Sequence, residues 1–355
     1  MNRTYYHEHT VERARKAYDE NTRHIQEHNE HAQRGKYSFE IRANSMADLS
    51  HDAYLKNFVR LRESAHPETH PHNVDKNDRD AHLVGAIHSM HRQFPVNTYT
   101  IPRSLDWRRL GFKTPAFNQA TCGSCYGFSI ATSIAGQVFK RTGKVVPLSV
   151  QQLVDCSAAF GNAGCQGGSL RATFRYLAST KGLMRMVDYP YASEKCHYLP
   201  SLAVVNVTSW ALLPTKDEKA MVRAIAMAGP IPISINAATR TFQLYSHGIY
   251  DDPKCSSESV NHAMLAVGYT PEYFILQNWW GDKWGENGYM KIRRGRNMCG
   301  LSNYAAYAIL PSMINDLISS VVSPNDDIWI IGLGGGGDSG DGGEAKNEKL
   351  YKSKE

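Results

Sequence analysis

Cys125 is the residue whose chemistry the sequence marks most clearly, because it lies where a polar loop gives way to an apolar helical pattern. Residues 119–124 form the loop, and Phe128, Ala131 and Ile134 begin the helical pattern directly after the cysteine. At a helix start, the unpaired backbone N–H groups and the positive end of the helix dipole favour an anion. A thiolate, not a thiol, is the nucleophile. The segment therefore indicates a nucleophilic cysteine.

His262 and Asn278 are the two residues that could make this cysteine catalytic. A cysteine hydrolase needs a base held in one tautomer beside the thiolate, and donors for the oxyanion. His262 lies roughly 140 residues downstream of Cys125 and Asn278 a little further, a spacing typical of one class of cysteine hydrolase. Taken singly, each of the three residues has a plainer interpretation. Cys125 could be a structural thiol or disulfide partner, His262 a core or surface histidine with its hydrogen bonds satisfied, and Asn278 the cap of a turn.

Size, composition and charge describe an ordinary globular chain. Its 355 residues allow one large domain or two ordinary ones, and 42% hydrophobic residues suffice for a real core. The formal net charge of +6 is scattered, so we expect no nucleic-acid partner. No apolar run approaches the roughly 18–20 residues of a membrane span, so we expect no membrane association. Because there is no His-Glu-x-x-His motif, we expect no metal, and we expect no cofactor.

The cysteines indicate an oxidising compartment. All seven lie between residues 122 and 299, and an odd count permits three disulfides and leaves one thiol. Asn206-Val207-Thr208 is a glycosylation sequon, although such triplets also arise by chance. The polar stretch 1–30 lacks the apolar core of a signal peptide. We therefore expect a lysosomal or extracellular protein whose N-terminus is incomplete or processed.

Residues 1–100 form a first part that is rich in histidine and contains no cysteine. A second helix is expected after Ser50, and residues 37–41 read as a short strand. The first helical pattern runs from about residue 9 to residue 34, with four residues near one stripe: Val11, Ala14, Tyr18 and Ile25. These helices carry few apolar residues for their length, so we expect them to dock on another surface.

Residues 101–311 hold all the cysteines and five of the six tryptophans. The helix that starts at Cys125 is closed by Gly143, whereas apolar runs beyond about residue 200 read as strands: 202–207, 230–235, 263–269, 273–278 and 288–293. A helical first half and a strand-rich second half predict an α+β fold of two subdomains with a cleft between them. Residues 312–355 form a Gly-rich tail that we expect to be disordered.

Several motifs carry a resemblance to a known family: Asp106-Trp107-Arg108, Cys122-Gly123-Ser124-Cys125-Tyr126, Gly164-Cys165-Gln166-Gly167-Gly168 and Trp284-Gly285-Glu286-Asn287-Gly288-Tyr289. With His262 and Asn278 downstream, the chain resembles the papain-like (family C1) cysteine proteases, of the cathepsin L and O kinds, over roughly residues 8–311. The resemblance implies a helical left half and a β-barrel-like right half. It also implies a cysteine endopeptidase made as a zymogen, with an inhibitory propeptide over residues 1–100.

The resemblance also implies roles for single residues. Cys125 is the nucleophile, paired with His262 as thiolate and imidazolium, and Asn278 orients the imidazole. Gln119 donates its side-chain amide to the oxyanion. Gly167 and Gly168 let an extended substrate lie close to the backbone, although Gly-Gly alone is most often a turn. A pocket for the second substrate side chain, apolar in preference, is implied at Leu170, Ser234, Ala263 and Tyr304.

The same resemblance pairs the remaining cysteines as Cys122–Cys165, Cys156–Cys196 and Cys255–Cys299. It implies a monomer whose partners are peptide or protein substrates and its own propeptide. Two departures stand beside the site: Tyr126 where most relatives carry Trp, and Trp279 where they usually have Ser. A catalytically impaired paralogue that acts as a binding or inhibitory protein is therefore the alternative. Labelling of Cys125 by a thiol-directed epoxide distinguishes the two.

The N-terminal part keeps much of the family's propeptide spacing, with Tyr18, Asn21, Ile25 and Asn29 in place. It also holds 12 of the 15 histidines. Many of these would gain charge at about pH 5–6, since an unperturbed histidine has a pKa near roughly 6.5. One hypothesis is that this charge loosens the propeptide. The alternative is that most of these histidines are solvated and have no such effect.

Overall fold

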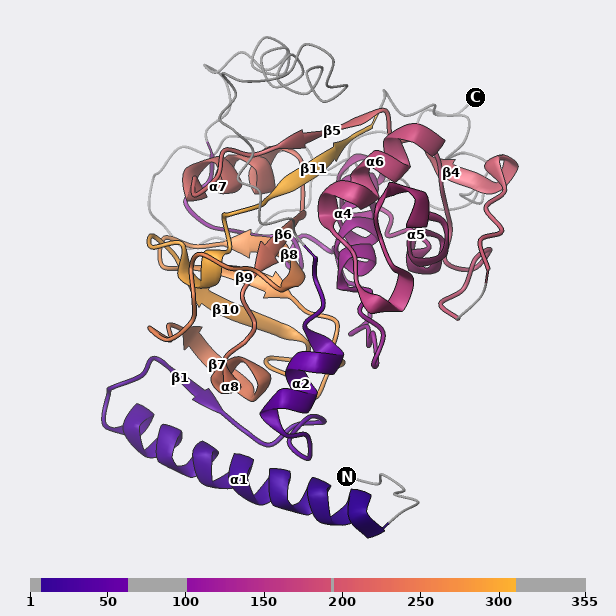
Figure 1. Cartoon of the computed structure of the whole chain (residues 1–355). Coiled ribbons are helices and arrows are strands. Elements are labelled where there is room, and N and C mark those ends of the chain that lie inside the picture. The colour runs from indigo at the N-terminus through magenta and orange to yellow at the C-terminus, as the bar shows by residue number, and fades with distance from the viewer. Residues whose placement is uncertain (1–7, 63–100, 193–194, 311–355) are drawn as a thin grey trace, which may run out of the picture.

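The structure is a computed structural model that describes residues 8–62, 101–192 and 195–310. The expected tail at 312–355 and most of the segment that joins the first part to the second lie outside these residues. In the part of the chain that the structure describes, no helix is both long and apolar enough to cross a membrane. The described residues form two halves with a third segment laid along them (Figure 1).

Helices dominate the first half. The central helix α4 (Cys125–Thr142) is buried on nearly every face because its sequence is rich in Ala, Ile, Phe and small polar residues. It ends at Gly143, whose φ of 71° is the left-handed conformation that glycine adopts without strain. The helices α5 (Val150–Cys156) and α6 (Leu170–Thr180) pack beside it. Ser149 and Ser169 cap the N-termini of these helices. Their hydroxyls accept from the backbone N–H groups of Gln152 and Ala172, which have no partner within the helix.

The second half is built on a seven-stranded sheet with the order β1-β7-β10-β9-β8-β2, in which β6 also pairs with β8. Its strands are β1 (Phe39–Ile41), β2 (Leu105–Asp106), β6 (Ile231–Ile235), β7 (Tyr245–Tyr250), β8 (His262–Tyr269), β9 (Tyr273–Gln277) and β10 (Tyr289–Arg293). Every residue of β6 and β8 is buried, since helix α4 covers them. The sheet therefore meets the helical half along α4, where both halves contribute to one core.

Smaller elements complete the two halves. Two further pairs of strands are antiparallel: β3 (Leu183–Met184) with β4 (Ala203–Val205), and β5 (Ser209–Leu212) with β11 (Ala306–Ile309). The short helices are α7 (Glu218–Met227), α8 (Arg240–Gln243), η1 (Ala158–Phe160), η2 (Gly164–Gln166), η3 (Pro200–Leu202) and η4 (Met298–Gly300). The strand β5 lies at the top of the view in Figure 1, next to β11.

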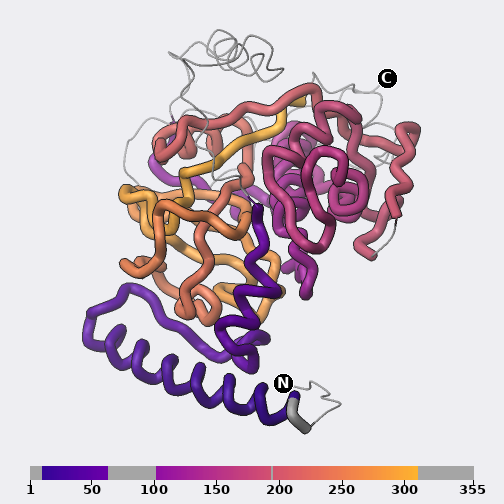
Figure 2. The backbone as a smooth tube through the Cα atoms, in the orientation of Figure 1, coloured from indigo at the N-terminus to yellow at the C-terminus, as the bar shows by residue number. Residues whose placement is uncertain are grey.

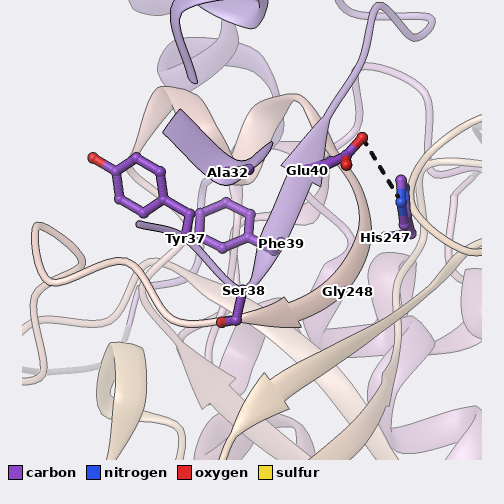
Figure 3. Close-up of a pocket in the computed structure, with 7 residues that line it drawn as sticks. All are labelled: Ala32, Tyr37, Ser38, Phe39, Glu40, His247 and Gly248. Carbon is purple, nitrogen blue, oxygen red and sulfur yellow. Dashed lines mark ion pairs between the residues drawn. The ribbon is translucent and has the colours of Figure 1, made fainter. Parts of the chain in front are cut away.

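The N-terminal segment 8–62 wraps the sheet half before it reaches the junction (Figure 2). It consists of α1 (Glu8–Gln33), β1 (Phe39–Ile41) and α2 (His51–Phe58). The strand β1 adds to the edge of the sheet by pairing antiparallel with β7. A small pocket lies where β1 meets β7, and across it Glu40 faces His247 at 3.8 Å (Figure 3).

The expected α+β fold of two halves is confirmed, and the helices and strands that the sequence indicated are present. The expected stripe of α1 is wrong in part, since Val11 and Tyr18 are 45% and 42% exposed. The buried face of α1 is instead formed by Ala17, Asn21 and His28. The reason is that α1 docks through polar groups: the Asn21 amide donates to two backbone carbonyls of the loop that precedes α2.

Candidate active site

Cys125 is the first residue of α4 and is fully buried. The residue before it, Ser124, places its hydroxyl 2.6 Å from the hydroxyl of Tyr191. The Tyr191 hydroxyl also donates to the backbone carbonyl of Gln119, at 3.3 Å. Tyr191 therefore links Gln119 in the loop to Ser124, the residue that precedes the helix.

The other six cysteines form disulfides in the pairs Cys122–Cys165, Cys156–Cys196 and Cys255–Cys299, the pairs that the resemblance implies. Cys125 is outside all three. The first bond joins the loop before Cys125 to the segment that ends in Gly167 and Gly168. It therefore holds the thiol and the two glycines in one region of the helical half.

His262 begins β8, and its Nε2 lies 2.8 Å from Oδ1 of Asn278, which follows β9. The backbone N–H of Trp279 donates to the same Oδ1, also at 2.8 Å. Because this atom accepts a backbone N–H, it is the amide oxygen, and Nε2 of His262 must carry the hydrogen of their bond. Nδ1 is thus the nitrogen left for proton exchange, and it is buried with no hydrogen-bond partner among the described residues.

Burial lowers the pKa of His262 to about 4, while the hydrogen bond with Asn278 raises it by a smaller amount. The Trp280 ring packs against the imidazole, with ring centroids 4.8 Å apart. In this state the imidazole is neutral at neutral pH. A protonated imidazole, which a thiolate partner requires, is disfavoured as long as water is excluded.

Gln119 is fully buried, and its side-chain amide donates to the carbonyl of Cys122 at 2.9 Å. Its backbone N–H donates to the carbonyl of Trp279 at 2.8 Å. The segment before Cys125 is thereby attached to the residue after Asn278. Gln119 and Cys125 lie in one stretch of sequence and Asn278 in another, and this contact holds the two stretches together.

Trp279 does not crowd the site as its bulk beside Asn278 suggested. Its side chain is fully buried and stacks on Phe128 of α4 with ring centroids 5.5 Å apart. Its indole N–H donates to the carbonyl of Ala263 at 2.9 Å. Tyr126 also points into the core, where its hydroxyl donates to the carbonyl of Gly164 at 3.1 Å. Both unusual residues therefore pack behind the site.

The end of the N-terminal segment crosses the junction between the two halves. The backbone N–H of Leu61 donates to the carbonyl of Asn261 on the sheet half, and that of Arg62 donates to the carbonyl of Gly168 on the helical half. A Cβ on Gly167 would lie 2.0 Å from the carbonyl oxygen of Arg60. This close approach explains the glycine. Cys125 and His262 are both fully buried while the segment crosses the junction.

The helix α2 supports this crossing with aromatic contacts. Tyr54 and Phe58 meet the Trp280 ring edge to face, at 5.6 and 6.2 Å. The Tyr54 hydroxyl donates to the carbonyl of Ala237 at 2.5 Å. Sequence reasoning noted the apolar residues of this helix but did not identify Arg60 and Leu61 as residues that cross the junction. The sequence of an extended segment has no periodicity that predicts which surface it will contact.

Three of the four residues expected around the second substrate side chain lie together. Ser234 and Ala263 are paired in register between β6 and β8, and the carbonyl of Tyr304 accepts from the backbone N–H and the hydroxyl of Ser234. Leu170 begins α6 on the helical half, two residues after Gly168, and is buried. The four residues come from both halves.

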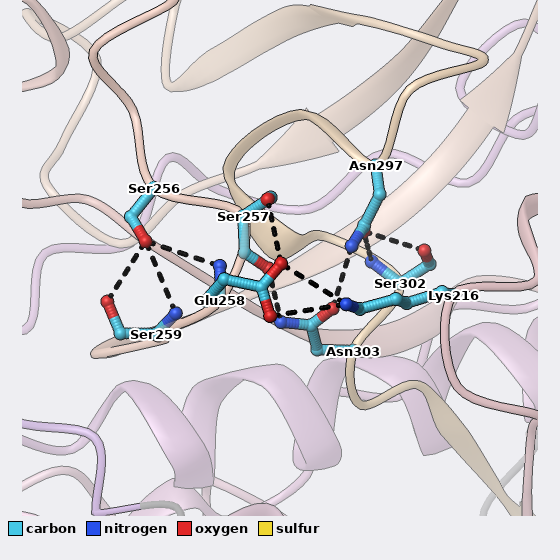
Figure 4. Close-up of polar contacts among 8 residues, drawn as sticks. All are labelled: Lys216, Ser256, Ser257, Glu258, Ser259, Asn297, Ser302 and Asn303. Atoms are coloured by element: carbon cyan, nitrogen blue, oxygen red, sulfur yellow. Dashed lines mark hydrogen bonds and ion pairs between the residues drawn. The ribbon is translucent and has the colours of Figure 1, made fainter.

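A polar network holds the loop that leads into His262 (Figure 4). The amide of Asn303 donates to the carbonyl of Ser257 at 2.7 Å, and Glu258 pairs with Lys216 at 3.2 Å. Asn297 accepts from the backbone N–H of Ser302 at 2.9 Å. The disulfide of Cys255 and Cys299 crosses the same region. The network joins the loop 256–259 to residues 297–303, which directly precede Tyr304.

Comparison with known proteins gives consistent results along the chain. A family model described as papain family cysteine protease matches residues 101–309. A cathepsin L-like peptidase of Aedes aegypti is 35% identical over 321 residues, which cover 87% of this chain and 91% of that protein. Procathepsin L of Mus musculus is 36% identical over 307 residues, 83% of this chain and 85% of the relative.

Among solved structures, a digestive procathepsin L 3 of the Tenebrio molitor larval midgut superimposes with a TM-score of 0.73 at 29% identity. The superposition covers 87% of this chain and 95% of the other. A recombinant stem bromelain precursor superimposes with a TM-score of 0.70 at 27% identity, with the same coverage. Both of these proteins are precursor forms, and in both comparisons the match extends beyond residues 101–309.

Proposed function

The chain belongs to the papain family of cysteine proteases, and from this premise we propose that Cys125, His262, Asn278 and Gln119 are its catalytic residues. It is a cysteine endopeptidase made as a zymogen. The observation that carries the assignment is the bond between His262 and Asn278, in which the amide oxygen requires Nε2 to hold a hydrogen and leaves Nδ1 for the thiol.

In the proposed reaction, the thiolate Sγ of Cys125 attacks the carbonyl carbon of the scissile peptide bond. The backbone N–H of Cys125 and the side-chain amide of Gln119 donate to the oxyanion. His262 gives the proton on Nδ1 to the leaving amine, and an acyl-enzyme thioester remains. Water then attacks the thioester after losing a proton to Nδ1, and the thiolate leaves. Asn278 holds the imidazole orientation throughout.

Residues 1–100 are proposed as the inhibitory propeptide, 101–311 as the protease domain and 312–355 as a tail that lies outside the described residues. The contacts of Leu61 and Arg62 with both halves support this assignment, because a segment there excludes substrate and water. Gly167 and Gly168 are proposed to bind the substrate backbone once the propeptide leaves. Removal of the propeptide is expected to relieve the burial that lowers the pKa of His262.

The pocket for the second substrate side chain is proposed at Leu170, Ser234, Ala263 and Tyr304, with a preference for an apolar residue. The contacts among Ser234, Ala263 and Tyr304, with Leu170 on the facing half, support this proposal. Natural substrates are proposed to be peptides or proteins, and the enzyme to act as a monomer. A lysosomal or extracellular location is proposed from the three disulfides. Asn206, exposed between β4 and β5, is proposed to carry a glycan.

The test uses the full chain, activated at acid pH. A thiol-directed epoxide is expected to label Cys125 stoichiometrically, and Cys125→Ala is expected to remove both labelling and peptide cleavage. Thr121→Ala, a change at an exposed loop residue nearby, is the matched control and is expected to keep both. An activated chain whose Cys125 resists the epoxide and that cleaves no peptide would support the binding or inhibitory alternative instead.

A further inference from the structure

We propose that Trp279 is a positioning residue: its buried side chain holds the helix that carries Cys125 against the strand that carries His262. The proposal rests on the proposed function, since it explains how the two residues of the catalytic pair, which come from different halves of the fold, keep one relative position. Trp279 is fully buried.

The side chain contacts both halves. On the helical side, the indole stacks on Phe128, three residues after Cys125 along α4, with ring planes 20° apart. On the sheet side, its N–H donates to the carbonyl of Ala263, the residue that follows His262 on β8. Helix α4 and strand β8 pack against each other in the core. The indole therefore links positions close to the thiol and to the imidazole.

The backbone of the same residue contacts the two remaining catalytic groups. Its N–H donates to Oδ1 of Asn278, the atom that also accepts from His262. Its carbonyl accepts from the backbone N–H of Gln119. A displacement of Trp279 is thus transmitted to both Asn278 and Gln119. Phe117, two residues before Gln119, completes the packing with its ring 6.5 Å from the indole.

Loss of this anchor has a consequence that a merely structural defect lacks. If Asn278 loses its position, its bond to Nε2 of His262 weakens, and the imidazolium releases its proton at lower pH. The alkaline limb of the activity profile would then move to lower pH. Because Trp279 acts through Asn278 and Gln119 in this proposal, kcat is expected to fall while KM stays near its original value.

The experiment compares Trp279→Phe with Trp107→Phe in the full chain, each activated by immobilised wild-type enzyme and normalised to titrated Cys125. Trp107 is a matched control, because it is also buried and its indole N–H also donates to a backbone carbonyl at 2.9 Å, that of Ile225 in α7. Both variants lose one such hydrogen bond and similar volume. Only the change at Trp279 alters the contact between α4 and β8.

For Trp279→Phe we expect kcat to fall about 10- to 100-fold, with KM within about twofold and the alkaline limb about one pH unit lower. For Trp107→Phe we expect an unchanged profile. The proposal is overturned if the two variants show the same kcat and pH profile. It is also overturned if kcat falls in Trp279→Phe but the alkaline limb of its activity profile does not move. Should W279F fail to fold, Trp279→Tyr replaces it with the same readouts.

A second measurement separates this proposal from the proposed function. The rate of alkylation of Cys125 by iodoacetamide, followed from pH 4 to pH 9, reports the thiolate–imidazolium pair without any peptide cleavage. In W279F the alkaline end of the rapid phase is expected to move to lower pH, as in the activity profile. If the wild-type chain cleaves no peptide, the proposed function fails, and the alkylation profiles still decide the role of Trp279.

Discussion

Docking of the N-terminal segment is expected to weaken as the pH falls, and His28 is the residue whose replacement tests this. His28 is 4% exposed in the docked segment, stacks on Tyr37 at 4.4 Å and places Nε2 3.1 Å from the carbonyl of Phe39. Burial lowers its pKa, and the nearby His31 acts in the same direction. The Phe39 carbonyl and two acidic groups, Asp252 of the sheet half and Glu40 of β1, act in the opposite direction.

His24 lies one turn earlier on α1 and has a lowered pKa as well. Its burial is the main cause, followed by the positive charge of Arg240. His28 and Lys254 also lower the pKa of His24, and Glu27 raises it. Both histidines therefore dock in the neutral form. The histidines of the N-terminal part are not equivalent in this respect, since these two are covered on docking and His31 remains exposed.

The direction in which docking changes with pH follows from the lowered pKa values of His24 and His28. Above the ordinary histidine pKa of about 6.5, both the docked and the released segment are neutral at these positions, and docking is at full strength. Below it, the released segment binds protons that the docked segment does not. Docking then weakens by about 1.4 kcal/mol, or tenfold in the equilibrium constant, per pH unit and per histidine at most. The loss stops below the lowered pKa.

The assay uses the full chain in a Cys125→Ala background, so that no self-cleavage occurs. Hydrogen exchange of the β1 amides, corrected for its intrinsic pH dependence, measures opening of the β1–β7 pair between pH 7.5 and 5. His28→Gln keeps a donor for the Phe39 carbonyl but does not titrate. We expect the pH dependence of protection to decrease by up to about tenfold per pH unit relative to the parent chain.

His31→Gln is the matched control, because it changes an exposed histidine on the same helix. Because His31 makes only one of the smaller contributions to the pKa of His28, this change is expected to alter the slope with pH less than His28→Gln does. Equal slopes for His28→Gln and the parent chain would refute the reasoning, and so would a His31→Gln chain whose slope decreases as much as that of His28→Gln.

Three further predictions concern the same docked segment. Gly248→Ala places a Cβ 2.5 Å from the carbonyl oxygen of Ser38 at a φ of 91°, so the zymogen is expected to leak activity in a peptide assay while the activated enzyme keeps its kcat. Tyr54→Phe removes the hydrogen bond to Ala237. A tryptic or synthetic prosegment with this substitution is therefore expected to have an inhibition constant for the activated enzyme that is roughly 2- to 12-fold higher. His262 is expected to titrate near pH 4 in the zymogen and at higher pH after activation, because removal of the segment relieves its burial; ring NMR signals measure both.

Local elements of the fold could be predicted from short-range rules. The helix that starts at Cys125 and ends at Gly143 follows from an apolar 3.6-residue pattern and a glycine stop, and Ser50 caps α2 as expected, accepting from the N–H of Ala53. The strand β7 was not predicted. Its sequence Tyr-Ser-His-Gly-Ile-Tyr is interrupted by polar residues and a glycine, because one of its neighbours is β1 of the N-terminal segment.

The face of α1 shows why the first helix was harder to interpret. Amphipathicity identifies a buried stripe only when burial is mainly apolar. Here Asn21 and Asn29 turn inward to donate to backbone carbonyls, while Tyr18 remains 42% exposed. A helix that docks by hydrogen bonds to backbone carries little hydrophobic signal about which side faces its partner.

The sequence by itself determined the chemical types at the candidate site and their order along the chain. A cysteine at a helix start, with a histidine and an asparagine downstream, follows from residue type and spacing. Only the tertiary structure decided how these groups meet. It makes Oδ1 of Asn278 a shared acceptor, links α4 to β8 through the indole of Trp279, and lays Leu61 and Arg62 across the junction. These contacts join residues that are far apart in the chain. They depend on packing in three dimensions, which local propensity and periodicity do not predict.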